Sequence, residues 1–423
     1  MSVSIFSLAW QSLMNRRVSA VLTVIAIALS VALFLGVEKA RTAAKDGFDN
    51  TISGTELIVG APSGQINLLL YSVFRLGNAT AEISWPAYEE IANREDVAWT
   101  VPISLGDSHR GYRVLGTNLD YFEHYKYGQR QSLAIAEGMV FDDLFDAVIG
   151  AEIAKQLGYG IGTPLILTHG IGAPGLNDHD NRPFRVVGIL RPTGTPVDQT
   201  IHVSLEAITA IHVGWETGTR SRFADSITEE MIRSLPSLTP RTITAVFVGL
   251  KNRATILRTR RDINTNMSEP MLAIIPGQAL AELWQVMGTA ERVLLAVSAF
   301  VIAVGLVSIL TSILTSLNER RREMSILRAV GARPGHVFAL LIVEAAVLGF
   351  VGAVLGALLI QLILAIAAPF LSLQYGIALM GTGPGLVDLY TIIAVTLAAT
   401  VLGVWPAITA LRRSLADGLT VRV

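Results

Sequence analysis

The sequence predicts an α-helical membrane protein with four transmembrane helices plus a large α+β extracytoplasmic domain between the first and second spans. Three observations predict this fold class. Of the 423 residues, 51% are hydrophobic and 16% are charged, whereas about 25% charged residues is usual in a soluble domain. The hydrophobic excess is confined to residues 18–37 and 293–411. The stretch between them has the composition of an ordinary globular domain.

Residues 1–37 predict an interfacial helix followed by the first span. Phe6, Trp10 and Leu13 fall largely on one helical face, which is typical of a helix at a membrane surface. Residues 18–37 then lack charge, and at about 1.5 Å per residue they cover a hydrocarbon core of about 30 Å. A cleaved signal peptide has a shorter apolar region of about 7–15 residues. We therefore expect an uncleaved span that continues as a helix to Phe48.

Residues 38–285 predict an α+β domain, because they contain short apolar runs and no run of membrane length. The expected strands are residues 55–60, 97–104, 164–168, 184–190, 200–203 and 242–250. The expected helices are residues 85–93, 151–157 and 252–266. This composition is compatible with one irregular domain or with two lobes. The apolar segment at residues 66–74 is compatible with an exposed loop that contacts a partner or lipid, or with core packing.

Residues 286–423 predict the remaining three spans. A helix that begins at Pro276 continues into the second span. The spans lie at about residues 290–317, 337–368 and 387–411, and residues 318–336 form the loop between the second and third. Pro369 is expected to end the third span, and Pro406 to kink the fourth.

Arginine placement predicts the orientation of the spans. Three clusters fall on one side of a four-span topology, and the short loop at residues 370–386 has no Lys or Arg. The clusters are Arg16 and Arg17; Arg320, Arg321, Arg322, Arg328 and Arg333; and Arg412, Arg413 and Arg422. The positive-inside rule therefore places both termini and residues 318–336 in the cytoplasm, and the large domain outside.

The arginine-rich loop predicts a short helix that contacts a partner. Its mixed charges and its apolar Ile326, Leu327 and Val330 at helical spacing distinguish it from a merely solvated loop. A helix of this kind docks into a groove of a partner, and Gly331 ends it. The candidate coupling residues are Glu319, Arg320, Arg321, Arg322, Glu323, Met324, Ile326, Leu327, Arg328, Ala329, Gly331 and Ala332.

This loop resembles the cytoplasmic loop of FtsX-like ABC transporter permeases, the family of MacB, the lipoprotein-releasing permeases and FtsX itself. Residues 8–17, the first span and Pro406-Ala407 are also similar to that family, and residues 148–154 and 184–190 resemble segments of the MacB-type periplasmic domain. The Asp-Pro pair common near the end of relatives is replaced here by Asp417-Gly418.

The resemblance implies a multi-pass permease of the bacterial inner membrane that forms a homodimer on a dimer of cytoplasmic ABC ATPase subunits. Movement of the ATPase would be transmitted to the periplasmic domain, for export or extraction of a lipoprotein, peptide, lipid or small amphiphile. A periplasmic adaptor or lipoprotein and membrane lipid are the further partners implied. The alternative is an FtsX-like signal transmitter that activates a periplasmic partner such as a cell-wall hydrolase.

Several kinds of chemistry are not expected in this chain. It contains no Gly-x4-Gly-Lys-Ser/Thr segment, so ATP and Mg²⁺ are expected on the separate ATPase. No cysteine is present, which excludes thiolate metal sites and disulfides. No nucleophile and base can be paired from their spacing, so we expect no catalytic residues. The net charge of −1 argues against nucleic-acid binding.

Three further groups of residues are weighed. Glu344 lies within the third span, where we favour a structural ion pair with Arg328 or Arg333 over a proton relay. Gly349, Gly352 and Gly356 predict close helix packing, either within one subunit or across a dimer. The remaining group invites a metal-site interpretation, but its spacing matches no closed ligand pattern, and we expect a turn-rich loop instead. Its members are His169, Asp178, His179, Asp180 and His202.

Overall fold

The computed structural model describes residues 14, 16–170, 182–214, 228–319, 333–375 and 383–416. The chain forms two compact units. The helical unit comprises residues 1–43, 288–370 and 381–423. The sheet unit comprises residues 44–287 and 371–380.

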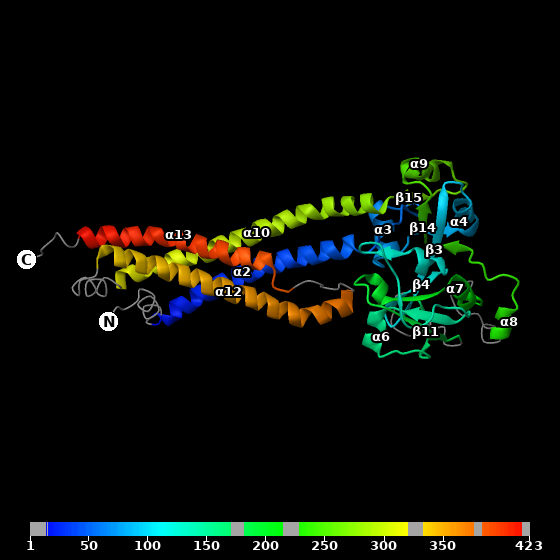
Figure 1. The fold of residues 1–423 in the computed structure, drawn as a ribbon, viewed down its shortest axis with the longest axis horizontal. Helices are drawn as coiled ribbons and strands as arrows, with labels where there is room; N and C mark the ends of the chain where they lie inside the picture. Colours follow the sequence, from blue (N-terminus) through cyan, green and yellow to red (C-terminus); the bar gives the residue numbers. More distant parts are fainter. Residues whose placement is uncertain are drawn as a thin grey trace, which may run out of the picture. The chain divides into compact units, whose positions relative to one another are not determined.

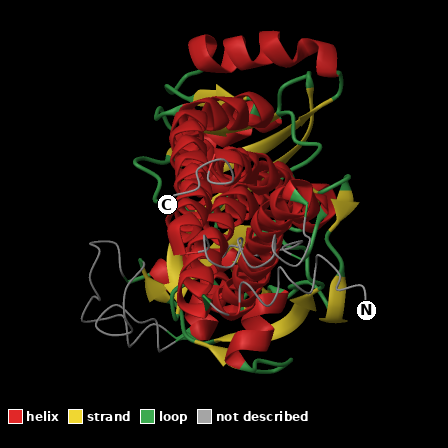
Figure 2. Cartoon of the chain, turned by 90° about the vertical axis from the view of Figure 1, so that its left-hand side faces the viewer, coloured by secondary structure: helices red, strands yellow, loops and turns green. Residues whose placement is uncertain are grey.

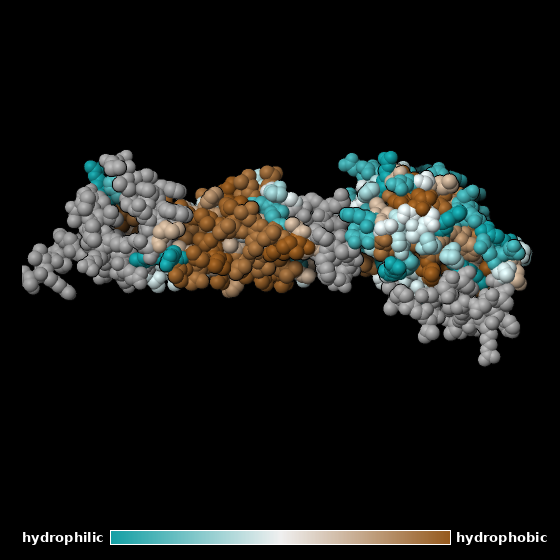
Figure 3. All heavy atoms as spheres, turned by 90° about the horizontal axis from the view of Figure 1, so that it is seen from below, coloured by the Kyte–Doolittle hydropathy of each residue, from teal (hydrophilic) through white to brown (hydrophobic). Residues whose placement is uncertain are grey.

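In its described residues the helical unit contains four long helices, which are drawn in Figures 1 and 2. They are α2 (Arg17–Asp49), α10 (Pro276–Glu319), α12 (Pro334–Tyr375) and α13 (Leu386–Ala416); α2 and α10 also contribute residues to the sheet unit. Each contains a stretch long and apolar enough to cross a membrane: Arg17–Ala43, Pro276–Thr315, Gly335–Ala367 and Leu386–Ala410. This confirms the four predicted spans. The described surface of this unit is hydrophobic on the face shown in Figure 3, as expected of side chains that meet lipid.

Small and branched side chains fill the core of the helical unit, with Val31 and Leu35 of α2, Ile309 of α10 and Ala399 of α13 among the fully buried ones. Many hydroxyl groups in the described parts of the spans donate to a carbonyl of their own helix: Ser30 Oγ, for example, donates to the carbonyl of Ala26 (2.7 Å). Such local bonds remove the cost of placing a hydroxyl where no water is available.

The apolar span within α12 ends at Ala367, close to the predicted end at Pro369, but the helix itself does not stop there. Helix α12 continues through Pro369 to Tyr375. A proline removes one backbone hydrogen bond, but ending the helix would expose several more polar groups, and spanning helices therefore tolerate proline. Helix α13 likewise runs through Pro406, where the kink stays a prediction.

The sheet unit combines short helices with many short strands, which confirms the α+β prediction. Its strands are β1 (Leu57–Gly60), β2 (Ile83–Ser84), β3 (Val97–His109), β4 (Tyr112–Thr117), β5 (Lys126–Tyr127), β6 (Gln131–Ser132), β7 (Ile135–Gly138), β8 (Asp146–Ile149), β9 (Pro164–Leu165), β10 (Thr168–His169), β11 (Phe184–Leu190), β12 (Thr200–Ser204), β13 (Thr242–Ile243), β14 (Ala245–Leu250) and β15 (Leu272–Ile274). Its helices are α3 (Gln65–Val73), α4 (Trp85–Ala92), α5 (Asp120–His124), α6 (Ala151–Leu157), α7 (Leu205–His212), α8 (Glu229–Arg233), α9 (Ile256–Asn266) and the 3₁₀ turns η1 (Pro196–Gln199) and η3 (Arg253–Thr255).

One mixed sheet organises this unit. Its strands follow the order β15-β1-β14-β3-β4-β12-β8-β11-β7, with β10 paired to β3 and β9 to β11. The first part of β3 pairs with β14, and its second part pairs with β4 across a register shift between Leu105 and Ser108. Strand β3 therefore joins the two ends of the sheet. Separate apolar clusters fill these ends, one around Val246 and Ile91 and one around Ile201 and Ile153.

One alternative left open by the sequence is decided in this unit, and one strand prediction is corrected. Residues 65–73 form helix α3 rather than an exposed loop, and Leu68, Leu69 and Tyr71 are buried in the core. Core packing is therefore the alternative that holds. The single strand expected at residues 164–168 is divided into β9 and β10, which pair with different strands, β11 and β3.

Candidate functional site

The arginine-rich loop connects α10 to α12. Candidate coupling residues Arg320 to Ala332 lie outside the described residues, and Glu319 is the last residue of α10. On the other side, Pro334 is the first residue of α12, a position where its missing N–H costs nothing. The N–H of Arg333 donates to His336 Nδ1 (3.1 Å). The loop therefore begins and ends at two spans, and its role in coupling stays a prediction.

The predicted packing glycines bring α12 close to two other helices of the same chain. A methyl group added at Gly349 would lie 2.5 Å from Ala399 Cβ of α13. At Gly352 and Gly356 the nearest atoms belong to α2, at 2.7 and 2.5 Å. These distances are too short for any side chain, so glycine permits the contact. Of the two arrangements left open by the sequence, the described contacts belong to the one within a subunit.

Glu344 is buried on α12, with 5% of its surface exposed. Helix α13 approaches this turn closely, since a methyl group added at Gly403 would lie 2.6 Å from Ala345 Cβ. Arg328, one of the two partners predicted for Glu344, lies outside the described residues. The pairing of Glu344 with arginine stays a prediction.

A buried ion pair that the sequence did not indicate joins α2 to α13. Lys39 Nζ lies 2.9 Å from Asp388 Oδ2, and their side chains are 13% and 8% exposed. Lys39 also donates to the carbonyl of Gly383 (3.0 Å). Asp388 accepts the N–H of Gly385 (2.7 Å), which caps the first turn of α13 as a carboxylate does at a helix N-terminus. In the sequence these two residues appear only as the charged limits of two spans.

A second, more exposed group of charges joins α2 to α10. Arg41 contacts Glu38 on its own helix at 2.7 Å and Glu291 of α10 at 4.0 Å. The side chain of Arg41 is 35% exposed, so its ion pair with Glu291 contributes little to stability. The charged ends of three spans are therefore held together by one strong and one weak contact.

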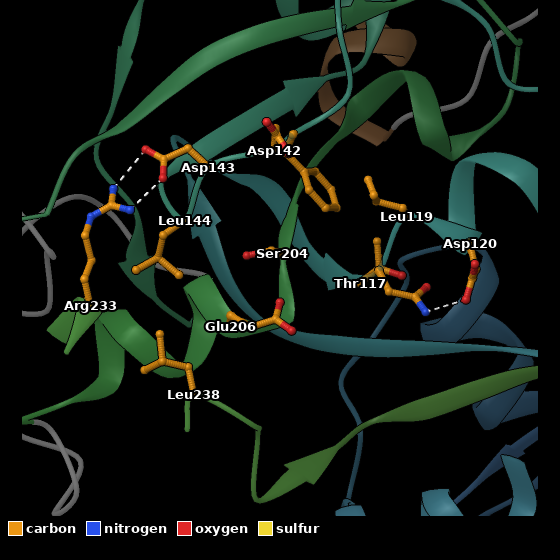
Figure 4. A pocket seen from close by; sticks show the side chains of 12 residues that line it. Thr117, Leu119, Asp120, Asp142, Asp143, Leu144, Ser204, Glu206, Arg233 and Leu238 are labelled. Atoms are coloured by element: carbon orange, nitrogen blue, oxygen red, sulfur yellow. Dashed lines mark hydrogen bonds and ion pairs between the residues drawn. The ribbon is translucent and has the colours of Figure 1, made fainter. Parts of the chain in front are cut away.

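The sheet unit contains an acidic cleft of about 690 Å³, shown in Figure 4. Asp120, Asp142 and Glu206 line it, together with apolar side chains such as Leu144. Arg233 forms a two-armed ion pair with Asp143 at its edge, at 2.6 and 2.9 Å. This pair lowers the pKa of Asp143 below its usual range. The cleft therefore presents mainly negative charge to a ligand.

The residues weighed as metal ligands do not form one group. His202 is fully buried, its ring lies 5.2 Å from that of Tyr121, and its Nδ1 donates to the carbonyl of Val148 (3.2 Å). Burial, together with the charge of Arg75, lowers the pKa of His202 to about 3. His169 instead lies beside Asp107 in another part of the sheet unit. Residues 178–180 are outside the described part of the chain.

Comparison with protein families identifies both parts of the chain. Residues 20–265 match the MacB-like periplasmic core domain, and residues 295–415 match the FtsX-like permease C-terminal domain. The comparison with curated proteins gave no match.

Two solved structures are among those similar to the chain. One is the periplasmic region of MacB from Actinobacillus actinomycetemcomitans, with 8% identity and a TM-score of 0.33, covering 55% of this chain and 94% of that one. The other is the extracellular domain of the noncanonic ABC-type transporter YknZ from Gram-positive bacteria, with 15% identity, a TM-score of 0.30, and coverage of 52% and 99%.

The family assignment rests on the two family models, because one alone covers more than half of the chain. Both agree with the four apolar spans and with the α+β unit inserted after the first span. The chain therefore belongs to the FtsX-like permeases with a MacB-like periplasmic core domain, and is a multi-pass membrane protein of the ABC transporter permease type.

Proposed function

We propose that two copies of this chain form the permease of a complex in which a separate ATPase dimer drives movement of the periplasmic domain. In this proposal both termini lie in the cytoplasm of a bacterial cell and the spans cross the inner membrane. The movement exports or extracts a lipoprotein, peptide, lipid or small amphiphile. Hydrolysis of ATP takes place on the partner, in keeping with the absence of a phosphate-binding loop from this sequence.

The observation that carries this proposal is the continuity of α10. This helix has 44 residues, from Pro276 to Glu319. It begins directly after β15 and ends directly before the arginine-rich loop. At about 1.5 Å per residue, these 44 residues form one continuously hydrogen-bonded helix about 66 Å long. A displacement of the loop is therefore applied directly to a rod that leads to the sheet of the periplasmic domain.

A substitution at Gly288 tests whether continuity of α10 matters. No atom lies within 4 Å of a methyl group added there, so Gly288→Ala is tolerated and serves as the control. Gly288→Pro removes a backbone bond and kinks or breaks the helix at a cost of about 3 kcal/mol. The two variants change the same open position and differ mainly in their effect on the helix.

The readout is the movement of the periplasmic domain. The chain has no cysteine, so Arg258→Cys on α9, whose side chain is 85% exposed, gives one spin label per copy. We expect ATP to shift the distance between labels in complexes of the parent chain and of Gly288→Ala, measured by pulsed electron spin resonance with the copurified ATPase. Gly288→Pro should abolish the shift while ATP hydrolysis continues. A full shift in Gly288→Pro would contradict transmission through α10.

The coupling loop is tested separately with Leu327→Asp. A carboxylate at this apolar position should prevent docking into a hydrophobic groove. We expect the ATP-dependent shift to disappear while thermal stability of the permease is unchanged. Retention of the shift would exclude Leu327 from the contact with the ATPase.

A further inference from the structure

Three side chains of the types that ligate metals converge from separate elements of the periplasmic domain. They are Asp107 in β3, His169 in β10 and His212 at the end of α7. His169 Nδ1 lies 3.2 Å from Asp107 Oδ1 and 3.1 Å from His212 Nε2. His212 Nε2 lies 3.6 Å from the same Asp107 oxygen. One ligand atom of each residue therefore faces a common point.

Strand pairing brings the first two residues together. His169 lies directly opposite Asp107 in the antiparallel pair of β10 and β3. The pair is extended by the N–H of Gly170, which donates to the carbonyl of Gly106 (2.8 Å). Side chains directly opposite each other in such a pair lie within contact distance. The proximity of Asp107 and His169 is therefore a consequence of the backbone.

The ring of His212 is oriented by its own helix. Its Nδ1 lies 2.7 Å from the carbonyl oxygen of Ile208. A carbonyl can only accept, so Nδ1 carries a proton, and in the neutral form of the ring the lone pair of Nε2 lies on the side of Asp107 and His169. A histidine that ligates a metal is commonly held in this way, by a hydrogen bond from its other ring nitrogen to a carbonyl.

The three separations agree with a tetrahedral metal site. Bonds of about 2.0–2.1 Å from Zn²⁺ to nitrogen and oxygen place neighbouring ligand atoms about 3.3–3.4 Å apart. The observed separations of 3.1, 3.2 and 3.6 Å bracket that value. Asp107 is 2% exposed, and buried carboxylates are commonly found paired with a charged group or coordinated to a metal.

We propose that Asp107, His169 and His212 bind a first-row divalent cation, Zn²⁺ in particular, with the fourth position left to water or another oxygen ligand. Two imidazoles with one carboxylate favour such a cation over Ca²⁺ or Mg²⁺, which select oxygen ligands. The cation joins the end of α7 to the paired strands β3 and β10. This proposal is independent of the transport function proposed above.

The sequence did not indicate this site, because the residues considered as metal ligands in the sequence analysis were a different group. Only His169 is common to both. Asp107 and His212 are 62 and 43 residues away from it, so no short ligand motif exists to be recognised. The pairing of β10 with β3 is what creates the site.

The test is metal binding by the full-length chain in detergent, purified with a tag that lacks histidine and treated with a chelator. The chain has no cysteine, so no thiolate competes for the metal. We expect calorimetry to find one Zn²⁺ per chain. Co²⁺ in its place should give the intense visible absorption of a four- or five-coordinate ion. An absence of binding, or the weak spectrum of octahedral cobalt, would overturn the proposal without reference to any variant.

Variants locate the binding. His169→Ala, at the most exposed of the three positions, and His212→Ala should each weaken Zn²⁺ binding at least about 10-fold. The matched control is His124→Ala. This residue stacks on Trp99 at 4.7 Å and lies with two exposed carboxylates in the other cluster of metal-ligating groups found in the described residues. Equal melting temperatures in chelator establish that the variants fold. Unchanged binding in His169→Ala and His212→Ala, or loss in His124→Ala, would contradict the assignment.

Discussion

The ion pair between Lys39 and Asp388 should stabilise the helical unit by more than charge attraction alone. Asp388 has two tasks: it pairs with Lys39 at 2.9 Å and accepts the N–H of Gly385 at 2.7 Å. We therefore propose three changes, which are Lys39→Met, Asp388→Asn and the exchange Lys39→Asp/Asp388→Lys. The exchange restores opposite charges but places a cation at the N-terminus of α13, where the helix dipole is unfavourable to it.

The expected magnitudes follow from burial and geometry. Removing one partner of a fully buried pair costs about 3–5 kcal/mol. Here the side chains are 13% and 8% exposed, and Lys39 retains the carbonyl of Gly383, so we expect about 2–3 kcal/mol for each single change. The double variant Lys39→Met/Asp388→Asn should lose less than the sum, with a coupling energy of about 1.5–3 kcal/mol. The exchange should remain at least about 1 kcal/mol less stable than the parent, because α13 loses its N-terminal carboxylate.

The assay is unfolding in mixed micelles followed by tryptophan fluorescence, with free energies compared across the cycle. Arg41 and Glu291, at 4.0 Å with 35% and 28% exposure, form the matched control pair, with an expected coupling below about 1 kcal/mol. Recovery of parental stability by the exchange would refute the capping role of Asp388. A coupling energy no larger than that of the control pair would refute the importance of burial.

Three further changes test other parts of the structure. Gly352→Ala should destabilise the helical unit by about 1–3 kcal/mol through overpacking against α2, measured by the same unfolding assay, whereas Gly335→Ala, where no atom lies within 4 Å, should have little effect. The pKa of His202 in the folded state is lowered to about 3, so the unfolded state binds a proton first as pH falls below about 6.5. The free energy of unfolding therefore decreases by about 1.4 kcal/mol per pH unit between about pH 6.5 and 3. His202→Gln should flatten this slope in thermal melts, and an unchanged slope would contradict the role of His202. Arg233→Ala should raise the pKa of Asp143 toward its ordinary value, as measured by carboxylate NMR titration, at a stability cost below about 1 kcal/mol because the pair is exposed.

The spans could be predicted from the sequence because a membrane leaves few choices. Without water, backbone groups must bond within the segment, so a long uncharged run implies a helix. The helix at residues 151–157 was also predicted to the residue, since Gly150 and Gly158 flank it. Gly158 has φ of +67°, a conformation that ends helices and that glycine adopts readily. Such elements can be predicted because residues that end helices flank them or because lipid surrounds them uniformly.

The features that could not be predicted from the sequence depend on contacts between residues distant along the chain. The apolar composition of residues 66–74 is compatible with a loop and with helix α3. Their burial depends on packing in the same core cluster as Ile58 and Phe247. Lys39 and Asp388 are separated by 349 positions, and their pairing requires the arrangement of the spans. In each case the chemistry of the residue was visible, whereas its partner was determined by the fold.

The packing of the helical unit also bears on which span would move in the proposed mechanism. Helix α2 is tied to α13 by the buried Lys39–Asp388 pair, and α12 approaches α2 and α13 at its glycines. Such dense contacts resist sliding. Only 17% of the apolar window of α10 is buried in the chain, against 33% in α12 and α13 and 39% in α2. Fewer contacts must therefore be broken for α10 to shift than for any other span, and α10 is the helix that leads from the sheet to the arginine-rich loop. We expect α2, α12 and α13 to behave as one body and α10 to carry the displacement.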